Sequence, residues 1–392
     1  MLIRCDRIFD EKSGGFIPGE IVIRGERFDA DAGEGGEALD YRGCYALPGF
    51  IDIHTHGVFG EAYFEASPER IAEMCRYIAG TGVTAVCPAT VTGGAAALEK
   101  GAAALAASAA FRGSGRAGNF RGAEIIGIYQ EGPFLSPKKP GAADLPSFRK
   151  PDAAFFKKLC GIAGEKGIAI RFVVIAPELE GGLDFIREIS GGEAPSAVCT
   201  MAHTTAGYET GRAAIERGAS QITHLFNAMP PLLHREPGII GAAFDAKNVK
   251  AELIADGVHV HPAMVRAAFE LFGDDRIVLI SDSIFSGLPD GAYSAGKLKV
   301  TVRGGAARNR QGALAGSCVT LGECVMNAVK NIGIPLYSAV KCASVNPAKQ
   351  SGVFHERGSI APGKFADLVL LNDDLSVRDV LVRGKWLREN GE

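Results

Sequence analysis

The sequence predicts an α/β fold in which a (β/α)8 TIM barrel carries a small β domain formed from both chain ends. Two observations support this fold class. Eight short apolar, β-branched runs recur through the middle of the 392-residue chain with helix-like segments between them, and strand-like pieces with glycine-rich turns occupy both ends. Eight strand–helix units in series, without a GxGxxG after the first strand, favour a barrel over the alternative, a doubly wound sheet.

The eight runs are continuously apolar rather than alternating, which is typical of strands buried on both faces of a parallel sheet. Helical patterns lie between them, for example at 67–80, 151–167 and 261–273. The first of these starts with Ser-Pro and ends in Gly, which favours a helix with those ends. We assign residues 47–355 to the barrel. In chain order the runs are ALPGFIDIH, VTAVCPAT, EIIGIYQEGP, IAIRFVVIAPE, PSAVCTMAHT, SQITHLFNA, VKAELIADG and RIVLISDS.

The two chain ends have a different character from the middle. Residues 1–46 and 356–392 both contain short strand-like pieces, and neither segment is long enough to form a sizeable core alone. We therefore predict that they form one discontinuous β domain, with the termini side by side. Residues 298–312, LKVTVRGGAARNRQG, follow the eighth run and predict a hairpin inserted into the barrel.

The composition is that of an ordinary soluble globular protein, with 47% hydrophobic and 22% charged residues. A net charge of -3 gives no general attraction to nucleic acid or to an anionic membrane. The alanine-rich run at 95–110 is interrupted by Glu99 and Lys100 and is too short to span a bilayer. Nine cysteines without a CxxC pair favour a reducing compartment, so we expect a cytoplasmic protein that binds neither nucleic acid nor membrane.

Two histidines in the first run, GFIDIHTHG, suggest a metal site. His54 and His56 are two positions apart on a predicted strand, so both side chains point to the same face. At the C-terminal mouth of a barrel strand, two such imidazoles can bind one metal ion. The pattern alone is not decisive, because the chain has a second HxH at His259 and His261.

Four further polar residues stand where other runs end, namely Glu131, His203, His224 and Asp282. Any one of them could be a buried histidine bonded to a neighbour or a carboxylate that caps the next helix. Because they converge with the histidine pair on one rim, we expect a metal site. Histidine nitrogen with carboxylate oxygen suits Zn²⁺, Fe²⁺, Mn²⁺ or Co²⁺, and the residues do not rank these ions.

The ligand types also suggest the chemistry. A divalent ion lowers the pKa of a bound water and polarises a carbonyl group. Asp282, an acidic group beside that water, is then the natural general base, and it can later return a proton to a leaving amine. The pattern therefore indicates metal-assisted hydrolysis.

Taken in order, PGFIDIHTHG, QEGPF, AHTTAG, THLFNAM, REPG, DGVHV and SDS resemble the amidohydrolase superfamily and, more narrowly, the N-acetylglucosamine-6-phosphate deacetylases. The resemblance extends over nearly the whole chain, to KFADLVLLNDDLSVRDVLVRGKW. It implies that residues 1–46 and 356–392 form a small β-sandwich domain beside the barrel. It further implies a homodimer with one or two divalent ions per subunit. It also implies that Glu131, His203 and His224 hold the principal ion, that Asp282 is the catalytic acid and base, and that His54 and His56 hold a second ion bridged by Glu131.

The substrate residues are predicted from the loops. The guanidinium of Arg235 suits a phosphate, and the alternative is a salt bridge with Glu236. By resemblance, His259 reaches the phosphate of the partner subunit's substrate, whereas His261, before a proline, starts a helix. The remaining implied substrate contacts are Asn227, Ala228, Leu314, Ala315, Gly316 and the backbone of Ala142.

One departure concerns Ala143, which stands where members of this family usually carry histidine or glutamine that helps to hold the substrate. A second ion could replace that role, or the accepted sugar could differ. The expected reaction is deacetylation of N-acetylglucosamine 6-phosphate, with the galactosamine epimer as the alternative.

Other classes of function fit the sequence less well. A cyclic-amide hydrolase would need a lysine at the end of the fourth run, where IRFVVIAPE has none, and an adenosine-deaminase-like enzyme would not need Glu131. A non-catalytic sugar-phosphate sensor is disfavoured because Asp282 and every ligand are present.

Overall fold

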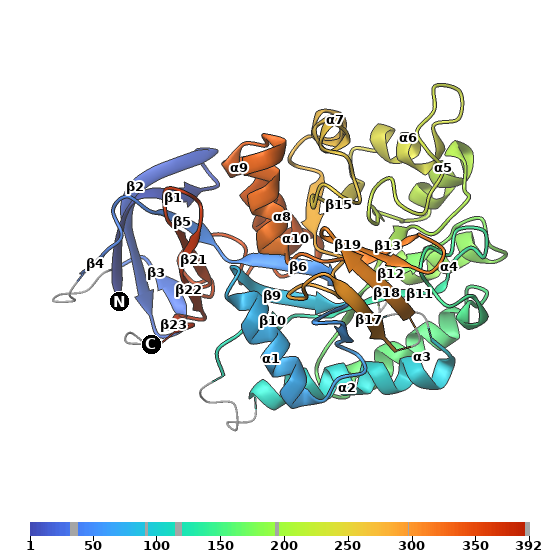
Figure 1. Ribbon diagram of the computed structural model, residues 1–392, viewed down its shortest axis with the longest axis horizontal. Helices are drawn as coiled ribbons and strands as arrows, with labels where there is room; N and C mark the ends of the chain where they lie inside the picture. Colours follow the sequence, from blue (N-terminus) through green and yellow to red (C-terminus); the bar gives the residue numbers. More distant parts are fainter. Residues whose placement is uncertain (32–37, 91–92, 114–119, 193–195, 297, 389–392) are drawn as a thin grey trace.

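We describe a computed structural model of the chain, covering residues 1–31, 38–90, 93–113, 120–192, 196–296 and 298–388. It consists of a barrel and a smaller β domain that lie side by side (Figure 1). The small domain contains the first strands of the chain together with the last ones. The (β/α)8 fold class predicted from the sequence is confirmed.

The barrel strands coincide with the eight apolar runs, and the third run is divided into two short strands. All neighbouring barrel strands with a registered pairing are parallel. The strands are β6 (Phe50–Thr55), β9 (Val83–Pro88), β10 (Glu124–Ile125), β11 (Ile128–Phe134), β12 (Ile170–Ile175), β13 (Val198–Met201), β14 (Gln221–Ile222), β15 (Lys250–Ile254) and β16 (Ile277–Ile280).

Two seams close the barrel. The sheet β10-β9-β6 meets the sheet β11–β16 through a parallel bridge between Ala89 and Tyr129. At the other seam, the Asp282 amide donates to the His54 carbonyl at 2.9 Å. Below it, Ser281 Oγ donates to Asp52 Oδ2 at 2.5 Å. Because the parallel strands share one direction, their C-terminal ends form a single rim.

Helices surround the barrel and follow the expected capping. Ser67 caps α1 by accepting from the Arg70 amide, Pro68 occupies the first turn, and His261 is the N-cap of α7, as predicted. No described helix is long and apolar enough to cross a membrane. The helices are α1 (Pro68–Ala79), α2 (Ala95–Gly113), α3 (Ala153–Gly164), α4 (Gly182–Ser190), α5 (Tyr208–Glu216), α6 (Gly238–Asp245), α7 (Pro262–Phe272), α8 (Leu321–Asn327), α9 (Leu336–Val340) and α10 (Asn346–Gln350), with a short 3-10 turn, η1 (Leu145–Ser147), and two π-helical turns, η2 (Ala328–Ile332) and η3 (Lys341–Val345).

The small domain is one eight-stranded sheet around its own apolar core. A bridge between Arg27 and Phe365 joins its edge to the segment before β21, so the sheet curls back on itself. Central β5 pairs with β1 on one side and with β21 on the other. It crosses the predicted domain boundary after residue 46, and the division of the chain into two domains stays a prediction. The strands are β1 (Leu2–Asp10), β2 (Gly15–Arg24), β3 (Arg27–Asp29), β4 (Ala38–Asp40), β5 (Tyr45–Pro48), β21 (Leu368–Leu371), β22 (Val377–Val382) and β23 (Lys385–Trp386).

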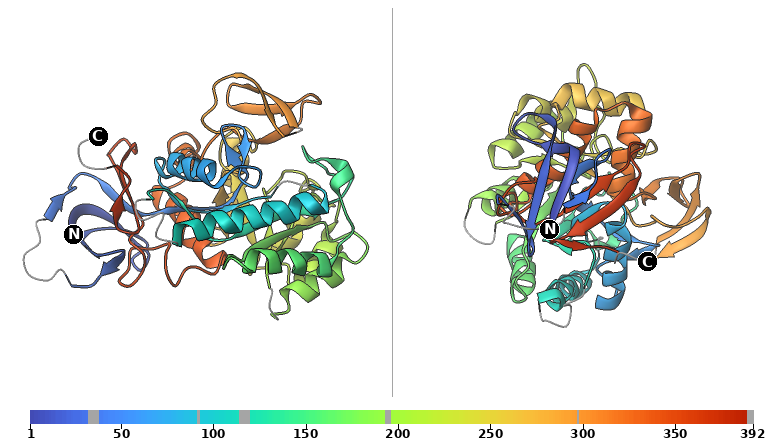
Figure 2. Two further views of the ribbon diagram at one scale, coloured as in Figure 1. Left: turned by 90° about the horizontal axis from the view of Figure 1, so that it is seen from below. Right: turned by 90° about the vertical axis from the view of Figure 1, so that its left-hand side faces the viewer.

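The insertion after β16 is larger than the predicted hairpin. It is a four-stranded antiparallel sheet that projects from the barrel in both views of Figure 2. Its last strand returns to the rim, where the Ser317 amide donates to the Asp282 carbonyl at 2.8 Å. Its strands are β17 (Gly291–Ala295), β18 (Leu298–Arg303), β19 (Ala306–Asn309) and β20 (Leu314–Ser317), and a smaller hairpin, β7 (Gly57–Val58) with β8 (Glu61–Ala62), follows β6.

Candidate metal centre

The six residues that were predicted to form the centre converge at the C-terminal rim of the barrel. Five of them lie at the end of a barrel strand or in the first residues after it. Glu131 lies within β11, where the pairing with β12 shifts its register between Gln130 and Phe134. The potential ligand atoms form two groups, each with its atoms within 4.8 Å of one another, and the two groups share one carboxylate. They are His54, His56 and Glu131, and Glu131, His203 and His224.

The geometry of His203 and His224 fits a metal ion. Their Nδ1 atoms face backbone carbonyls, that of Lys139 at 2.9 Å and that of Asn227 at 3.2 Å. A ring that donates Nδ1–H to a carbonyl keeps a lone pair on Nε2. The two Nε2 atoms are 3.1 Å apart, and each is 3.4 Å from Glu131 Oε1. Two lone pairs and a carboxylate oxygen that face one another match the donor set of a divalent cation.

The histidine pair on β6 fits a second group around the same carboxylate. His56 Nε2 lies 3.0 Å from Glu131 Oε2, and His54 Nε2 lies 3.7 Å from Oε1. The His54 side chain is fully buried, and its Nε2 has no hydrogen-bond partner among the described residues. One oxygen of Glu131 thus faces His203 and His224 while the other faces His56, as a bridging ligand would.

Asp282 stands beside this second group. Its Oδ1 is 3.2 Å from His56 Nε2 and 3.7 Å from His54 Nε2. Burial alone would raise the pKa of Asp282, but hydrogen bonding and the charge of the two histidines hold it below its usual value. The carboxylate is therefore ionised at neutral pH and can accept a proton.

The backbone at the rim is strained. His203, His224 and Asp282 have φ values of 45°, 36° and 48°, a region that non-glycine residues seldom adopt. Phe226 and Ala228, in the loop after β14, share this feature with φ of 75° and 49°. Such strain tends to gather at functional sites, where the surrounding structure compensates for it.

Two glycines allow neighbouring loops to approach the centre. Gly141 has φ of +58°, and a Cβ there would lie 2.9 Å from His203 Cε1. Gly316 has φ of +77°, and a Cβ there would lie 3.1 Å from the Asp282 carbonyl oxygen. The loop that carries Ala142 and Ala143 therefore lies against His203, and Leu314–Ser317 lies against Asp282. The methyl group of Ala143 offers no hydrogen bond to a substrate.

Asn227 and Ala228, predicted as substrate contacts, hold the loop after β14. The Asn227 carbonyl accepts from His224, and its side-chain amide donates to the carbonyls of His224 and Leu225, both at 3.2 Å. The Ala228 carbonyl accepts from the Thr204 amide at 3.2 Å. The supporting role of these two residues was not predicted from the sequence.

The two predicted phosphate residues differ in their surroundings. His259 Nδ1 lies 2.7 Å from Asp256 Oδ2, and its side chain is only 6% exposed. Burial alone would lower the pKa of His259, but Asp256 outweighs this and raises it, with a smaller contribution from Asp282. Arg235 is exposed, and its contact is with His234 Nε2 at 2.5 Å rather than with Glu236. No described hydrogen bond or ion pair joins Arg235 to the metal centre.

Residues below the centre were also missed. Glu252 on β15 is fully buried and lies 3.1 Å from His54 Nδ1. The Tyr129 ring stacks on His54 with centroids 4.2 Å apart, and the amide of Glu131 donates to Thr90 Oγ1 at 3.2 Å. The signal for Glu252 was an acidic residue in the middle of the apolar run VKAELIADG.

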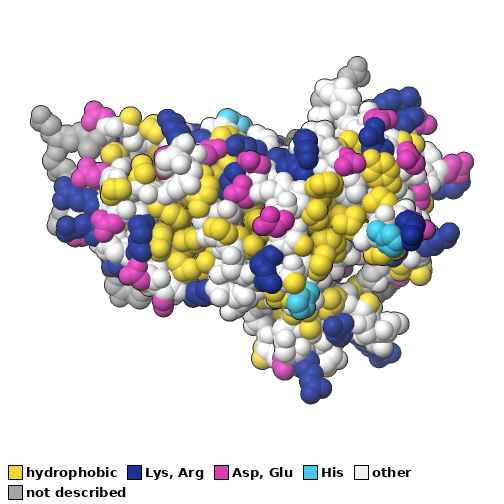
Figure 3. Space-filling view, turned by 90° about the horizontal axis from the view of Figure 1, so that it is seen from above, with side chains coloured by type: hydrophobic (Ala, Val, Ile, Leu, Met, Phe, Trp, Pro, Cys, Tyr) yellow, Lys and Arg dark blue, Asp and Glu magenta, His cyan; other side chains and the backbone are white. Residues whose placement is uncertain are grey.

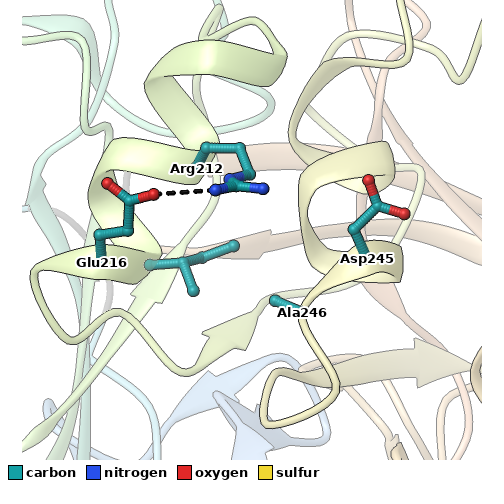
Figure 4. Close-up of a pocket in the computed structure, with 5 residues that line it drawn as sticks. Arg212, Glu216, Asp245 and Ala246 are labelled. Carbon is teal, nitrogen blue, oxygen red and sulfur yellow. Dashed lines mark hydrogen bonds and ion pairs between the residues drawn. The ribbon is translucent and has the colours of Figure 1, made fainter.

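The outer surface offers no comparable cluster in the part of the chain described. A cavity of about 170 Å³ lies between α5 and α6, where Arg212 and Glu216 form an ordinary helical ion pair at 2.9 Å (Figure 4). Basic and acidic side chains are interspersed over the face seen in Figure 3, with apolar patches between them. The chemistry therefore belongs at the barrel rim.

Comparisons with known proteins agree with this site. The model of the amidohydrolase family matches residues 45–387. N-acetylglucosamine-6-phosphate deacetylase of Bacillus subtilis (strain 168) is 37% identical over 339 residues, which cover 86% of this chain and 83% of the relative. N-acetylgalactosamine-6-phosphate deacetylase of Escherichia coli O157:H7 is 33% identical, with 86% of each chain covered.

A solved structure is similar over almost the whole length. It is a mutant of N-acetyl-D-glucosamine-6-phosphate deacetylase from Mycobacterium smegmatis in complex with N-acetyl-D-glucosamine-6-phosphate. Its TM-score is 0.87 at 33% identity, with 99% of both chains covered. The chain therefore belongs to the amidohydrolase family, within the group of N-acetylglucosamine-6-phosphate deacetylases.

Proposed function

We propose that the protein hydrolyses the acetamide of N-acetyl-D-glucosamine 6-phosphate to D-glucosamine 6-phosphate and acetate. The observation that carries the proposal is the pair of ligand groups that share Glu131, with Asp282 beside them. A hydrolase needs a group that accepts a proton from water next to its electrophilic centre. Asp282 has that position, and membership of the deacetylase group supplies the substrate class.

The donor set supports a divalent metal cofactor. Glu131, His203 and His224 would hold the principal ion, and His54 and His56 with Glu131 would hold a second one. Such an ion would polarise the amide carbonyl and make water easier to deprotonate. Zn²⁺, Fe²⁺, Mn²⁺ and Co²⁺ all suit nitrogen and carboxylate ligands, so the metal is proposed by class.

Asp282 would carry the proton through the reaction. Its Oδ1 would accept a proton from the attacking water and later pass it to the amide nitrogen as the carbon–nitrogen bond breaks. The products are then acetate and the free amino sugar phosphate. The contacts from Ser317 to the Asp282 carbonyl and from the Asp282 amide to His54 would hold the carboxylate in place during both transfers.

The remaining substrate contacts are proposed from the loops at the rim. The backbones of Ala142, Leu314, Ala315 and Gly316 would line the sugar site, because their segments lie against His203 and Asp282. Asn227 and Ala228 would complete it beside His224. Arg235 and His259 would bind the phosphate, for which a forked guanidinium and an imidazolium are suitable.

We also propose a homodimer in a reducing cytoplasm, consistent with nine cysteines that are all free. Among the large exposed apolar side chains, Leu232 and Leu233 lie in the loop after β14, Phe244 on α6 and Met264 on α7. Helices α6 and α7, which carry the last two, lie together at the top of Figure 1. Arg235 is in the same exposed loop as the two leucines, so this surface could present it to a second subunit.

Mixed dimers test whether His259 serves its own or the neighbouring site. In a dimer of one Asp282→Asn chain and one His259→Ala chain, the site with an intact Asp282 would receive an intact histidine only across the interface. Restored acetate release in the mixture would place His259 in the partner's site. Activity no higher than that of the separate variants would place it in its own.

Substrate choice is tested by acetate release from N-acetylglucosamine 6-phosphate and from its galactose epimer, with metal content measured on the same sample. The galactosamine substrate is the second candidate, because one of the similar enzymes acts on it and Ala143 departs from the expected residue. We expect faster release from the glucose epimer. A metal-loaded protein that releases acetate from neither sugar would overturn the proposal.

A further inference from the structure

The floor of the metal centre contains a buried polar layer that the proposed reaction does not use. Five side chains in it are completely inaccessible to solvent, in a barrel core that is otherwise mostly apolar. Four of them belong to strands β11, β13, β14 and β15, and the fifth, Thr223, directly follows β14. The layer consists of Tyr129, Thr200, Gln221, Thr223 and Glu252.

Hydrogen bonds link this layer to His54. Gln221 Nε2 donates to Glu252 Oε1 at 2.6 Å, while Tyr129 O–H and His54 Nδ1 face Oε2 at 3.3 and 3.1 Å. Thr223 Oγ1 lies 2.6 Å from the Tyr129 hydroxyl. With three groups directed at its two oxygens, Glu252 serves as an acceptor, so the Nδ1 proton of His54 points towards it.

This contact fixes both the tautomer and the orientation of His54. A ring that donates from Nδ1 presents its Nε2 lone pair to the other side, towards Glu131 and Asp282. Stacking on Tyr129 restrains the same ring. A carboxylate that accepts from a metal-binding histidine orients it and increases its basicity. His203 and His224, by contrast, donate only to backbone carbonyls.

The charge count points the same way. Three carboxylates face the imidazole of His54, namely Glu131 and Asp282 at Nε2 and Glu252 at Nδ1, and all three are largely or fully buried. Burying a carboxylate is unfavourable unless opposite charge lies nearby. One divalent ion carries two positive charges, so a third carboxylate matches a second ion better than a single one.

We propose that Glu252 is the positioning residue that allows a second divalent ion to bind at His54, His56 and Glu131. The inference depends on the metal centre in the proposed function, but not on which sugar is hydrolysed. Glu252 acts through His54 and touches neither the substrate nor the ion. The principal group at Glu131, His203 and His224 does not depend on it.

Zn²⁺ titration of chelator-treated protein tests this role, with the ion count and the two dissociation constants as readouts. Wild type should bind two Zn²⁺ per chain. Glu252→Gln should keep the tighter ion, whereas its affinity for the second should fall by about 10- to 100-fold. Tyr129→Phe keeps the stacked ring and removes one donor to Glu252, so it should lower the affinity for the second ion by a smaller factor. This variant provides the test if Glu252→Gln does not fold.

Asp52→Asn is a matched control. It makes the same carboxylate-to-amide change on the buried floor, but Asp52 contacts Ser281 and the His54 backbone amide rather than the imidazole. It should bind both ions as wild type does. A purely structural Glu252 would lower the thermal stability of the metal-free protein and leave both Zn²⁺ affinities unchanged.

Two results would overturn the inference: wild-type affinity for both ions in Glu252→Gln, or only one Zn²⁺ per wild-type chain. Acetate release by a one-ion enzyme would still uphold the proposed function. Conversely, two ions bound with the second lost in Glu252→Gln would uphold the role of Glu252 even if no acetate were released.

Discussion

Two buried charged clusters in this molecule look alike in composition but differ in how their charges are matched. At the joint between the barrel and the small domain, Arg357 Nη2 donates to Glu124 at 2.6 Å and Nη1 lies 3.1 Å from Asp367. Arg383 adds a bond to Glu124 at 3.0 Å. At the barrel rim, the acids face histidine lone pairs instead. The joint contains its own cations, whereas the rim is arranged to receive one.

This difference separates a structural cluster from a functional one. Arg357 is 2% exposed and Asp367 4%, so each is retained in the interior only because its partner is there. The rim keeps strained backbone and converging donors that folding alone would not favour. The comparison predicts that changes at the rim alter metal binding and turnover, while changes at the joint alter stability.

The largest effect is expected from Asp282→Asn. The variant should retain its metal and its melting temperature, but its kcat should fall by about 10²- to 10⁴-fold, because general acid–base catalysis contributes that much. Initial rates of acetate release and metal analysis of one preparation check this. Turnover close to wild type would remove Asp282 from the proton-transfer role.

Arg357→Leu should have the opposite effect: it should lower stability and leave turnover unchanged. Leaving Asp367 and Glu124 buried without their main cation should lower the free energy of unfolding by about 3–5 kcal/mol, measured by denaturant titration. The folded fraction should still bind metal and release acetate at the wild-type rate. Arg4→Leu is the control, because Arg4 forms an exposed ion pair with Glu20. This variant should lower the free energy of unfolding by at most about 1 kcal/mol. Equal losses in the two variants would show that the joint is not a special cluster.

Metal removal should separate the two regions in a single protein. Chelation should abolish acetate release and lower the melting temperature, because a ligand at about 100 times its Kd stabilises the folded state by roughly 2.7 kcal/mol. Arg357→Leu should lower the free energy of unfolding by the same amount with and without metal, because the effects of distant sites on stability add. If the loss of unfolding free energy caused by Arg357→Leu changed strongly on chelation, the two clusters would be energetically coupled.

A smaller effect is expected from Arg235→Ala. If this exposed guanidinium binds the phosphate, KM should rise by about 10-fold or more while kcat changes little, because the contact is equally strong in substrate and transition state. Arg212→Ala, which removes an exposed arginine from the α5 surface, is the control. A KM unchanged from wild type would exclude Arg235 from phosphate binding.

The sequence allowed good prediction wherever burial and residue type alone decide the structure. The eight strands followed from continuous apolar runs, and the rim residues followed from the polar side chains that end them. The start of helix α1 could be predicted because its N-cap, Ser67, and its first residue, Pro68, depend only on neighbouring residues. That the polar residues share one rim followed from the common direction of parallel strands. The grouping of Glu131, His203 and His224 as one set of ligands was implied by the family resemblance.

What escaped prediction depends on contacts between distant residues. The acidic residue at 252 was visible in VKAELIADG, but nothing local indicates that it meets His54, 198 positions away. The Asn227 carbonyl holds His224 through a backbone atom, which carries no sequence signal. The curl of the small sheet likewise depends on Arg27 meeting Phe365.

The most direct test of the metal centre is to strip the protein with a chelator, return Zn²⁺ stepwise, and measure bound metal and acetate release from N-acetylglucosamine 6-phosphate at each step. We predict that activity is absent at zero metal and rises with the ions bound, and that His203→Ala, which lacks a ligand to the principal ion, fails to recover it. Full activity in the stripped protein, or metal binding with no acetate at any occupancy, would contradict the assignment of the rim as a hydrolytic metal centre.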